Sequence, residues 1–386
     1  MSTTSALLAL ISLSLLPACG APTERDDARG DDRRATDLAV RARPDAGGSR
    51  TDPEAGLRPD AGPDAGGPAG HKGIWAWSAT LRGHEPAFLA WVKQHAYTDL
   101  FVLVKGISGT IKYDVLDTLL ALRAAAPAGA PRIWAWVVGM SDTGPVGAAA
   151  GYLVGHLVSP DNAGYRAHLA TTVRRAIDPS RGQVQRVPDG VMLDDSFQWP
   201  SQSYGGTTAH RVQSLMAVVD AIRAEIDAAQ KTAGRSILLG FAPHPETSVY
   251  SGGSSILSYS AYAYGQDFGE LARRCDWLVP ETYRYDFYGQ TSAWIGKVVQ
   301  AIEKEITLEC PARSAMVKVY PAIVLYTSDT APSAASAAEL DGDRSAALAA
   351  AGGYSVFRYA SKSVNPGTKA DGHDWPTAAQ SQVLDR

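Results

Sequence analysis

Short apolar runs alternate with longer stretches of mixed polarity from Gly73 to the end of the chain. The runs are apolar almost throughout, as is typical of strands that are covered on both faces. The stretches between them carry apolar residues at helical spacing. Eight runs predict strands, at 74–77, 99–105, 132–139, 190–195, 236–242, 277–283, 317–326 and 354–359. Helices are expected between them, at 86–96, 113–126, 165–177, 210–229, 266–274, 291–305 and 336–350.

Strands that alternate with helices favour parallel βαβ units in an α/β protein. Eight such units in residues 72–386 predict a single (β/α)₈ TIM barrel. A doubly wound open sheet is the alternative. A dinucleotide-binding sheet of that kind would carry a glycine-rich phosphate loop after its first strand, and residues 75–79 (Trp-Ala-Trp-Ser-Ala) do not form one.

The chain begins with an apolar run, residues 6–16, that is too short to span a bilayer. It ends in Leu16-Pro17-Ala18-Cys19, which resembles the lipobox of bacterial lipoproteins. The resemblance implies a signal peptide at 1–18, a lipidated Cys19 and export to the cell envelope. Because Gly20 stands where inner-membrane lipoproteins commonly carry Asp, it favours the outer membrane. An ordinary secretory signal that is cut near Ala18 is the alternative.

Residues 19–71 are rich in Asp, Arg, Pro, Gly and Ala and repeat a Pro-Asp-Ala-Gly unit. A segment with so few large apolar side chains cannot offset the entropy of ordering it, so we expect a disordered tether. The net charge of -4 argues against nucleic acid as a partner, and we expect a monomer. The chain has three cysteines, and two of them, Cys275 and Cys310, are not accounted for by the lipobox. They could form a disulfide in an exported domain or stay as two buried thiols.

Functional groups of a (β/α)₈ barrel lie at the C-terminal ends of its strands. Polar and aromatic residues follow the predicted strands here, and the chain contains 9 Trp and 16 Tyr. For each aromatic residue, filling of the barrel is the alternative to stacking on a sugar, and we favour filling for Trp75 and Trp134. For Lys105 and His244 the alternative is a solvated loop residue. The candidate substrate-binding residues are Trp77, Lys105, Trp136, His244, Tyr283 and Tyr359.

The fourth strand carries the sharpest signal, because two carboxylates, Asp194 and Asp195, follow a buried apolar run. Side chains alternate along a strand, so one of the two should face the barrel mouth and the other should brace a neighbour. The fuller motif Leu193-Asp194-Asp195-x-Phe197-x-x-Pro200 is similar to glycoside-hydrolase-like barrels related to family ten. Pro280-Glu281-Thr282-Tyr283 resembles the acid-plus-Tyr strand ends of such barrels.

The resemblance implies an exported glycoside hydrolase that acts on a polysaccharide through two carboxyl groups. Asp194 would be the nucleophile or base and Glu281 the general acid, with Asp195 supporting them unless the two Asp roles are exchanged. The Glu that chitinase-type barrels place two residues after their last strand-four Asp is missing, since Ser196 and Phe197 stand there. A catalytically inactive carbohydrate-binding lipoprotein is the alternative function.

Other chemistries lack their motifs. The chain has no His-Glu-x-x-His, no cysteine pair at zinc spacing, no Gly-x-Ser-x-Gly and no Walker loop. A cation held by Asp194, Asp195 and His244 is conceivable, but no spacing supports it. We therefore expect neither a cofactor nor a metal.

Overall fold

The computed structural model describes residues 70–194, 197–199, 204–245, 256–285, 289–327, 333–360 and 374–386, with only the backbone of 256–259. The predicted signal peptide and nearly all of the predicted tether lie outside these residues. His71, which we assigned to the tether, belongs to the folded domain instead: it begins strand β1 and is buried. Among the described residues, no helix is long and apolar enough to cross a membrane.

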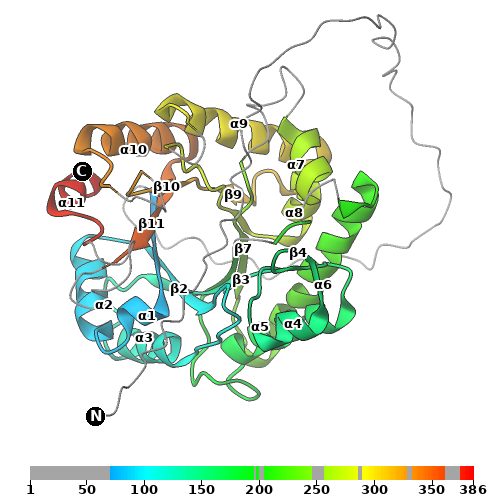
Figure 1. Cartoon of the computed structure of the whole chain (residues 1–386). Helices are drawn as coiled ribbons and strands as arrows, with labels where there is room; N and C mark the ends of the chain where they lie inside the picture. The colour runs from blue at the N-terminus through cyan, green and yellow to red at the C-terminus, as the bar shows by residue number, and fades with distance from the viewer. Residues whose placement is uncertain are drawn as a thin grey trace, which may run out of the picture. The chain divides into compact units, whose positions relative to one another are not determined.

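A parallel sheet forms the centre of the domain, and helices surround it (Figure 1). Its strands are β1 (His71–Ala76), β2 (Asp99–Lys105), β3 (Arg132–Val138), β6 (Gly190–Asp194), β7 (Leu238–Phe241), β8 (Trp277–Leu278), β9 (Lys318–Val319), β10 (Ala322–Val324) and β11 (Gly353–Tyr359). A short antiparallel hairpin, β4 (Tyr152–Val154) and β5 (Leu157–Val158), stands apart from it.

The order of the strands closes the sheet into a barrel. It runs β10-β11-β1-β2-β3-β6-β7-β8-β9, and β9 and β10 are separated by only Tyr320 and Pro321. The Tyr320 N–H donates to Leu278 O at 2.9 Å, and the Ser355 N–H donates to Pro321 O at 2.9 Å. The broken strand β9–β10 therefore joins β8 to β11 as the seventh of eight barrel strands. This confirms the predicted (β/α)₈ fold.

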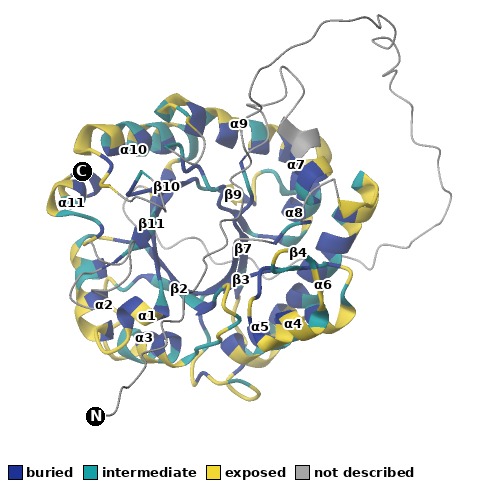
Figure 2. Ribbon diagram, viewed as in Figure 1, coloured by how far each residue is buried: buried dark blue, intermediate teal, exposed yellow. Residues whose placement is uncertain are grey.

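All seven predicted helices are present, with ends shifted by a few residues. The described helices are α1 (Ser78–Leu81), α2 (Glu85–Gln94), α3 (Asp114–Ala125), α4 (Pro145–Ala150), α5 (Ala163–Ile177), α6 (Thr208–Ala233), α7 (Ile256–Tyr264), α8 (Phe268–Arg274), α9 (Ser292–Glu309), α10 (Ala337–Ala351) and α11 (Ala378–Leu384). Their ends follow local chemistry. Helix α10 begins with a capping box of Ser336 and Glu339 and ends at Gly352, whose φ of 66° suits glycine. The helices bury the faces that meet the sheet (Figure 2).

Aromatic side chains fill the barrel interior. The ring centroids of Trp134 on β3 and Trp277 on β8 are 4.6 Å apart, although β6 and β7 lie between these strands in the sheet. Both rings therefore lie inside the barrel. Trp75 lies 4.4 Å from Phe101, and both are fully buried. The structure thus confirms that Trp75 and Trp134 are core residues.

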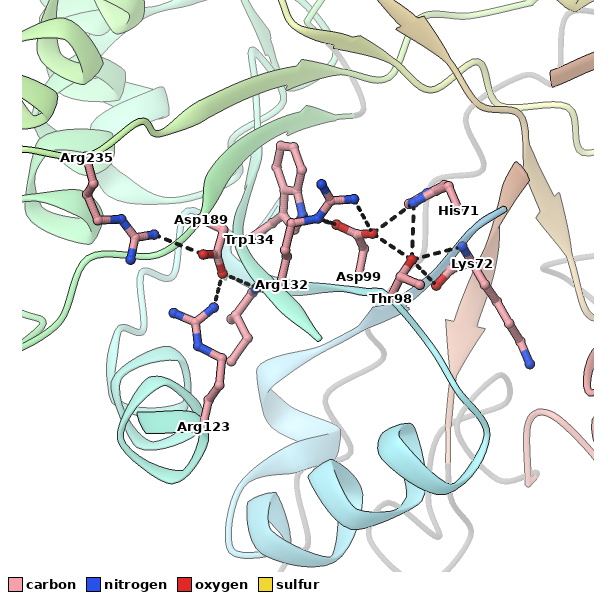
Figure 3. Close-up of polar contacts among 10 residues, drawn as sticks. His71, Lys72, Thr98, Asp99, Arg123, Arg132, Trp134, Asp189 and Arg235 are labelled. Atoms are coloured by element: carbon pink, nitrogen blue, oxygen red, sulfur yellow. Dashed lines mark hydrogen bonds and ion pairs between the residues drawn. The ribbon is translucent and has the colours of Figure 1, made fainter. Parts of the chain in front are cut away.

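A buried ionic network lies at the N-terminal ends of β1, β2 and β3 (Figure 3). Asp99 accepts hydrogen bonds from Arg132 Nε and Trp134 Nε1 at 2.9 and 2.7 Å, and it lies 2.9 Å from His71 Nδ1. Burial alone would raise the pKa of Asp99, but the charges and hydrogen bonds of His71 and Arg132 hold it well below its usual range. This end of a TIM barrel ordinarily serves stability.

Cys275 and Cys310 are free, buried thiols in the structure. No disulfide joins them, which agrees with the second of the two alternatives. Burial raises the pKa of the Cys275 thiol to about 12, so it is a poor nucleophile at neutral pH.

Candidate active site

Asp194 ends strand β6 and faces the barrel interior. A Cβ added to Gly190 would lie 2.3 Å from the Trp134 ring, and one added to Gly240 would lie 2.4 Å from Met192. Gly190 and Met192 therefore point inward, and Asp194 has the same strand parity. Its side chain enters the barrel mouth, by which we mean the interior at the C-terminal strand ends, and is only 4% exposed.

The β6 strand holds this carboxylate in a fixed register. Asp194 pairs with Val138 of β3, and the Gly139 N–H donates to Asp194 O at 3.2 Å. Asp195 and Ser196 lie outside the described residues, so the supporting role of Asp195 stays a prediction. The parity of β6 favours Asp194 as the one that faces the mouth.

Glu281 lies just beyond β8, the sixth strand of the barrel, and is half-buried. Its N–H donates to Pro243 O at 3.2 Å, and it bridges Ala322 in parallel. Trp277 and Tyr283 both lie inside the barrel, and Glu281 shares their strand parity. Because only β7 separates β6 from β8, the backbones that carry the two acids are about 10 Å apart.

Two polar atoms beside this region have unmet hydrogen-bonding capacity. Trp136 Nε1 and His244 Nδ1 are both buried, and neither has a hydrogen-bond partner among the described residues. Buried polar atoms of this kind are uncommon and costly unless water or a ligand meets them. Hydroxyl groups of a sugar could do so.

The ring of Trp136 is 3% exposed and packs edge-on against Trp75, with a centroid separation of 5.0 Å. It cannot form the open stacking wall that we predicted, because it fills the barrel. Tyr283 stacks on Phe357 at 5.3 Å inside the barrel and is 9% exposed, so the mouth is lined by its ring.

Trp77 remains at the rim, directly after β1, and is half-buried. The guanidinium of Arg358 lies 3.5 Å from the centroid of its ring and covers one face. Such a contact fixes the ring by cation–π attraction. At most the other face of Trp77 can meet a sugar.

Lys105 is not placed to bind a substrate, which corrects our prediction. It is fully buried, lies 3.4 Å from Asp142 Oδ2, and donates to Val138 O and Ser141 O at 3.3 and 3.4 Å. Asp142 also accepts hydrogen bonds from the Tyr165 hydroxyl and the Gly144 N–H, each at 2.8 Å. Lys105 thus joins β2 to the β3 loop.

Tyr359 also departs from the prediction. Its ring lies 4.5 Å from Phe88 and 5.1 Å from Trp91, both on helix α2. It therefore packs between β11 and the outer helices, and burial raises the pKa of its hydroxyl. The side chain does not line the barrel mouth.

Gln266 is a positioning residue that the sequence did not reveal. It is buried, its Oε1 accepts from the His244 N–H at 3.0 Å, and its Nε2 donates to Phe197 O at 3.1 Å. These bonds tie the segment after β6 to the segment after β7. No local motif marks such a residue, because its partners are 22 and 69 positions away.

Comparisons with known proteins agree with this architecture. No protein-family profile matches the chain, and no curated protein sequence matches it significantly. Among solved structures, the chain is similar to the PgaB (BpsB) glycoside hydrolase domain from Bordetella bronchiseptica, with a TM-score of 0.56 and 11% identity over 75% of this chain and 94% of that one. It is also similar to an endo-β-1,4-mannanase from Thermotoga petrophila, with a TM-score of 0.55 and 12% identity over 83% and 76% of the two chains. At these identities the likeness establishes the fold: a barrel of the kind that glycoside hydrolases use.

Proposed function

We propose that the chain is an exported glycoside hydrolase that cleaves a polysaccharide at its barrel mouth. The observation that carries the proposal is the placement of Asp194 and Glu281. Asp194 ends β6 and Glu281 lies just beyond β8, both share the parity of inward-facing residues, and one strand separates them. Trp136 on the neighbouring strand β3 and His244 after β7 each carry a buried polar atom without a hydrogen-bond partner among the described residues.

The two acids divide the chemistry as glycoside hydrolysis requires. Glu281, half-buried, donates its proton to the leaving oxygen, and Asp194 stabilises the anomeric carbon as nucleophile or activates a water as base. If Asp194 is the nucleophile, the two carboxyl groups should be about 5 Å apart. If it is a base, they should be about 6.5–9.5 Å apart, which leaves room for the attacking water. Inward-pointing side chains on strands about 10 Å apart can meet either requirement.

The barrel likeness supports a carbohydrate substrate, since the neighbours above are named as a glycoside hydrolase domain and a mannanase. The chain itself supplies the acids, but it does not identify the sugar. A screen of polysaccharides with the chain from Gly20 onward, scored by release of reducing ends, tests this. We expect release from at least one glycan, and none from the same glycan with Asp194→Asn. Binding without release by both proteins would favour the inactive carbohydrate-binding lipoprotein.

We further propose that Cys19 is lipidated and anchors the chain in the outer membrane, with residues 20–71 as the tether. The lipobox-like Leu16-Pro17-Ala18-Cys19 supports this. In a host with two membranes, the full chain should fractionate with the outer membrane, and Cys19→Ser should not. Equal membrane association of both forms would contradict the anchor.

A further inference from the structure

Three carboxylates from helices α8 and α9 converge on the outside of the barrel, away from the mouth. Asp267 is the N-cap residue of α8, and Glu305 and Glu309 lie one turn apart near the end of α9. One carboxylate oxygen from each lies within 4.8 Å of the other two. We call these three residues the carboxylate cluster. The two helices are neighbours in the outer layer (Figure 1).

The helix end adds to the negative charge of the cluster. Glu305 and Glu309 lie at the C-terminal end of α9, where the helix macrodipole is negative and a basic side chain is usual. The last turn of α9 contains none. A cation at this position would therefore meet both the side chains and the helix dipole.

Glu305 is the buried member of the cluster, with 1% of its surface exposed. Its Oε2 has no hydrogen-bond partner among the described residues, although the Phe268 N–H donates to the carboxylate. A buried carboxylate oxygen without a partner is costly, and it points to a missing ligand. Burial and the charges of Asp267 and Glu309 raise the pKa of Glu305 to about 9.

The basic groups nearby do not neutralise the cluster. Burial and the charge of Asp267 raise the pKa of Glu309, although the charge of Arg273 opposes this shift. The Arg273 guanidinium donates to Glu309 O at 2.7 Å and lies 3.8 Å from Glu270. Arg273 thus caps α9 and pairs with Glu270. It does not contact Glu305 Oε2, which has no hydrogen-bond partner among the described residues.

We propose that Asp267, Glu305 and Glu309 bind a divalent cation of the calcium class that clamps α8 to α9. Calcium takes only oxygen ligands, at about 2.3–2.6 Å, so two ligands on opposite sides of the ion are about 4.8 Å apart. The observed spacing of the three oxygens fits within that span.

Calorimetric titration of the EDTA-treated chain with CaCl₂ tests this, beside thermal unfolding. We expect one bound Ca²⁺ per chain, and a rise in Tm of about 5 °C at about 100 times the Kd. Neither heat nor a Tm shift up to about 10 mM Ca²⁺, beyond the range of weak extracellular sites, would overturn the proposal. A Mg²⁺ response as large as the Ca²⁺ response would contradict the calcium class.

Two variants locate the ion. Glu305→Gln removes the buried charge, and Asp267→Asn keeps an N-cap residue on α8, so each should fold and each should lose the Ca²⁺ response. The exposed Glu303→Gln on the same helix is the matched control and should keep it. Retention of the response by both cluster variants would place the ion elsewhere and overturn the proposal. Because the readouts are binding and stability, the result does not depend on hydrolysis.

Discussion

Lys105, Tyr359 and Asp194 are each the last residue of a barrel strand, yet only Asp194 faces the mouth. The difference lies in strand register. The pairing of β2 with β3 shifts between Leu103 and Lys105, and the pairing of β11 with β1 shifts before Tyr359. A register shift changes which face a side chain takes, and no residue pattern announces it. β6 pairs regularly, so alternation predicted the direction of Asp194 correctly.

Lys105 is therefore expected to serve stability. Replacing it by Met leaves the buried Asp142 carboxylate without its cation, which should lower the free energy of unfolding by about 3 kcal/mol. Urea denaturation at neutral pH measures this. The exposed Lys304→Met serves as control and should change stability by less than about 0.5 kcal/mol. A Lys105→Met protein as stable as the wild type would show that the ion pair is unimportant.

At the scale of elements, the sequence predicts the alternation of strands and helices well, because hydrophobic period and caps are local signals. It does not predict that Pro321 interrupts the seventh strand, or that β4 and β5 form a hairpin. The hairpin joins strands of only three and two residues, which are too short to show a hydrophobic period, whereas the break in the seventh strand depends on pairing partners that are distant in sequence. The packing of one loop on another is hidden for the same reason, as Gly139 illustrates.

Gly139, directly after β3, is packed under the Phe197 ring. A Cβ at this position would lie 2.3–2.7 Å from ring atoms of Phe197. Gly139→Ala should therefore cost about 1–3 kcal/mol of stability and displace the segment after Asp194, which should lower hydrolytic activity. Gly129→Ala, where nothing lies within 4 Å, is the spatial control, although its φ of 64° adds backbone strain. Phe197→Leu in the Gly139→Ala background should restore part of the loss, and a further loss would contradict the packing argument.

The Asp99 network and the Asp194 site lie at opposite ends of the barrel. At the N-terminal end both carboxylate oxygens of Asp99 accept hydrogen bonds (Figure 3), although His71 Nε2 has no partner; at the C-terminal end Asp194 lies near Trp136 Nε1 and His244 Nδ1, which also have none among the described residues. A buried carboxylate whose oxygens are all hydrogen-bonded suits stability. Sequence motifs indicated the second region, but the first became visible only when three strands brought His71, Asp99 and Arg132 together.

The Asp99 network predicts a pH dependence of stability. The folded-state pKa of Asp99 lies below the unfolded value of about 4, so its contribution is present above about pH 4 and is lost as the pH falls through the folded pKa. Asp99→Asn should cost about 3 kcal/mol at pH 7, and the difference from the wild type should shrink below pH 4. The exposed Asp114→Asn should show neither effect. Denaturant unfolding at pH 7 and pH 3 measures the difference in free energy of unfolding between the wild type and Asp99→Asn. An equal difference at the two pH values would contradict a stabilising role of the ionised Asp99 carboxylate.

The proposed hydrolysis depends most on Asp194 and Glu281 acting together in one reaction at the barrel mouth. Its direct test is kcat/KM of four folded proteins, the wild type, Asp194→Asn, Glu281→Gln and the double variant, on a glycan that the wild type cleaves. We predict that each single change lowers kcat/KM by about 10²–10⁴-fold, and that the double variant is little worse than the weaker single one, because the two groups serve one step. A Glu281→Gln protein within tenfold of the wild type, or losses that multiply in the double variant, would contradict the pairing of these two acids.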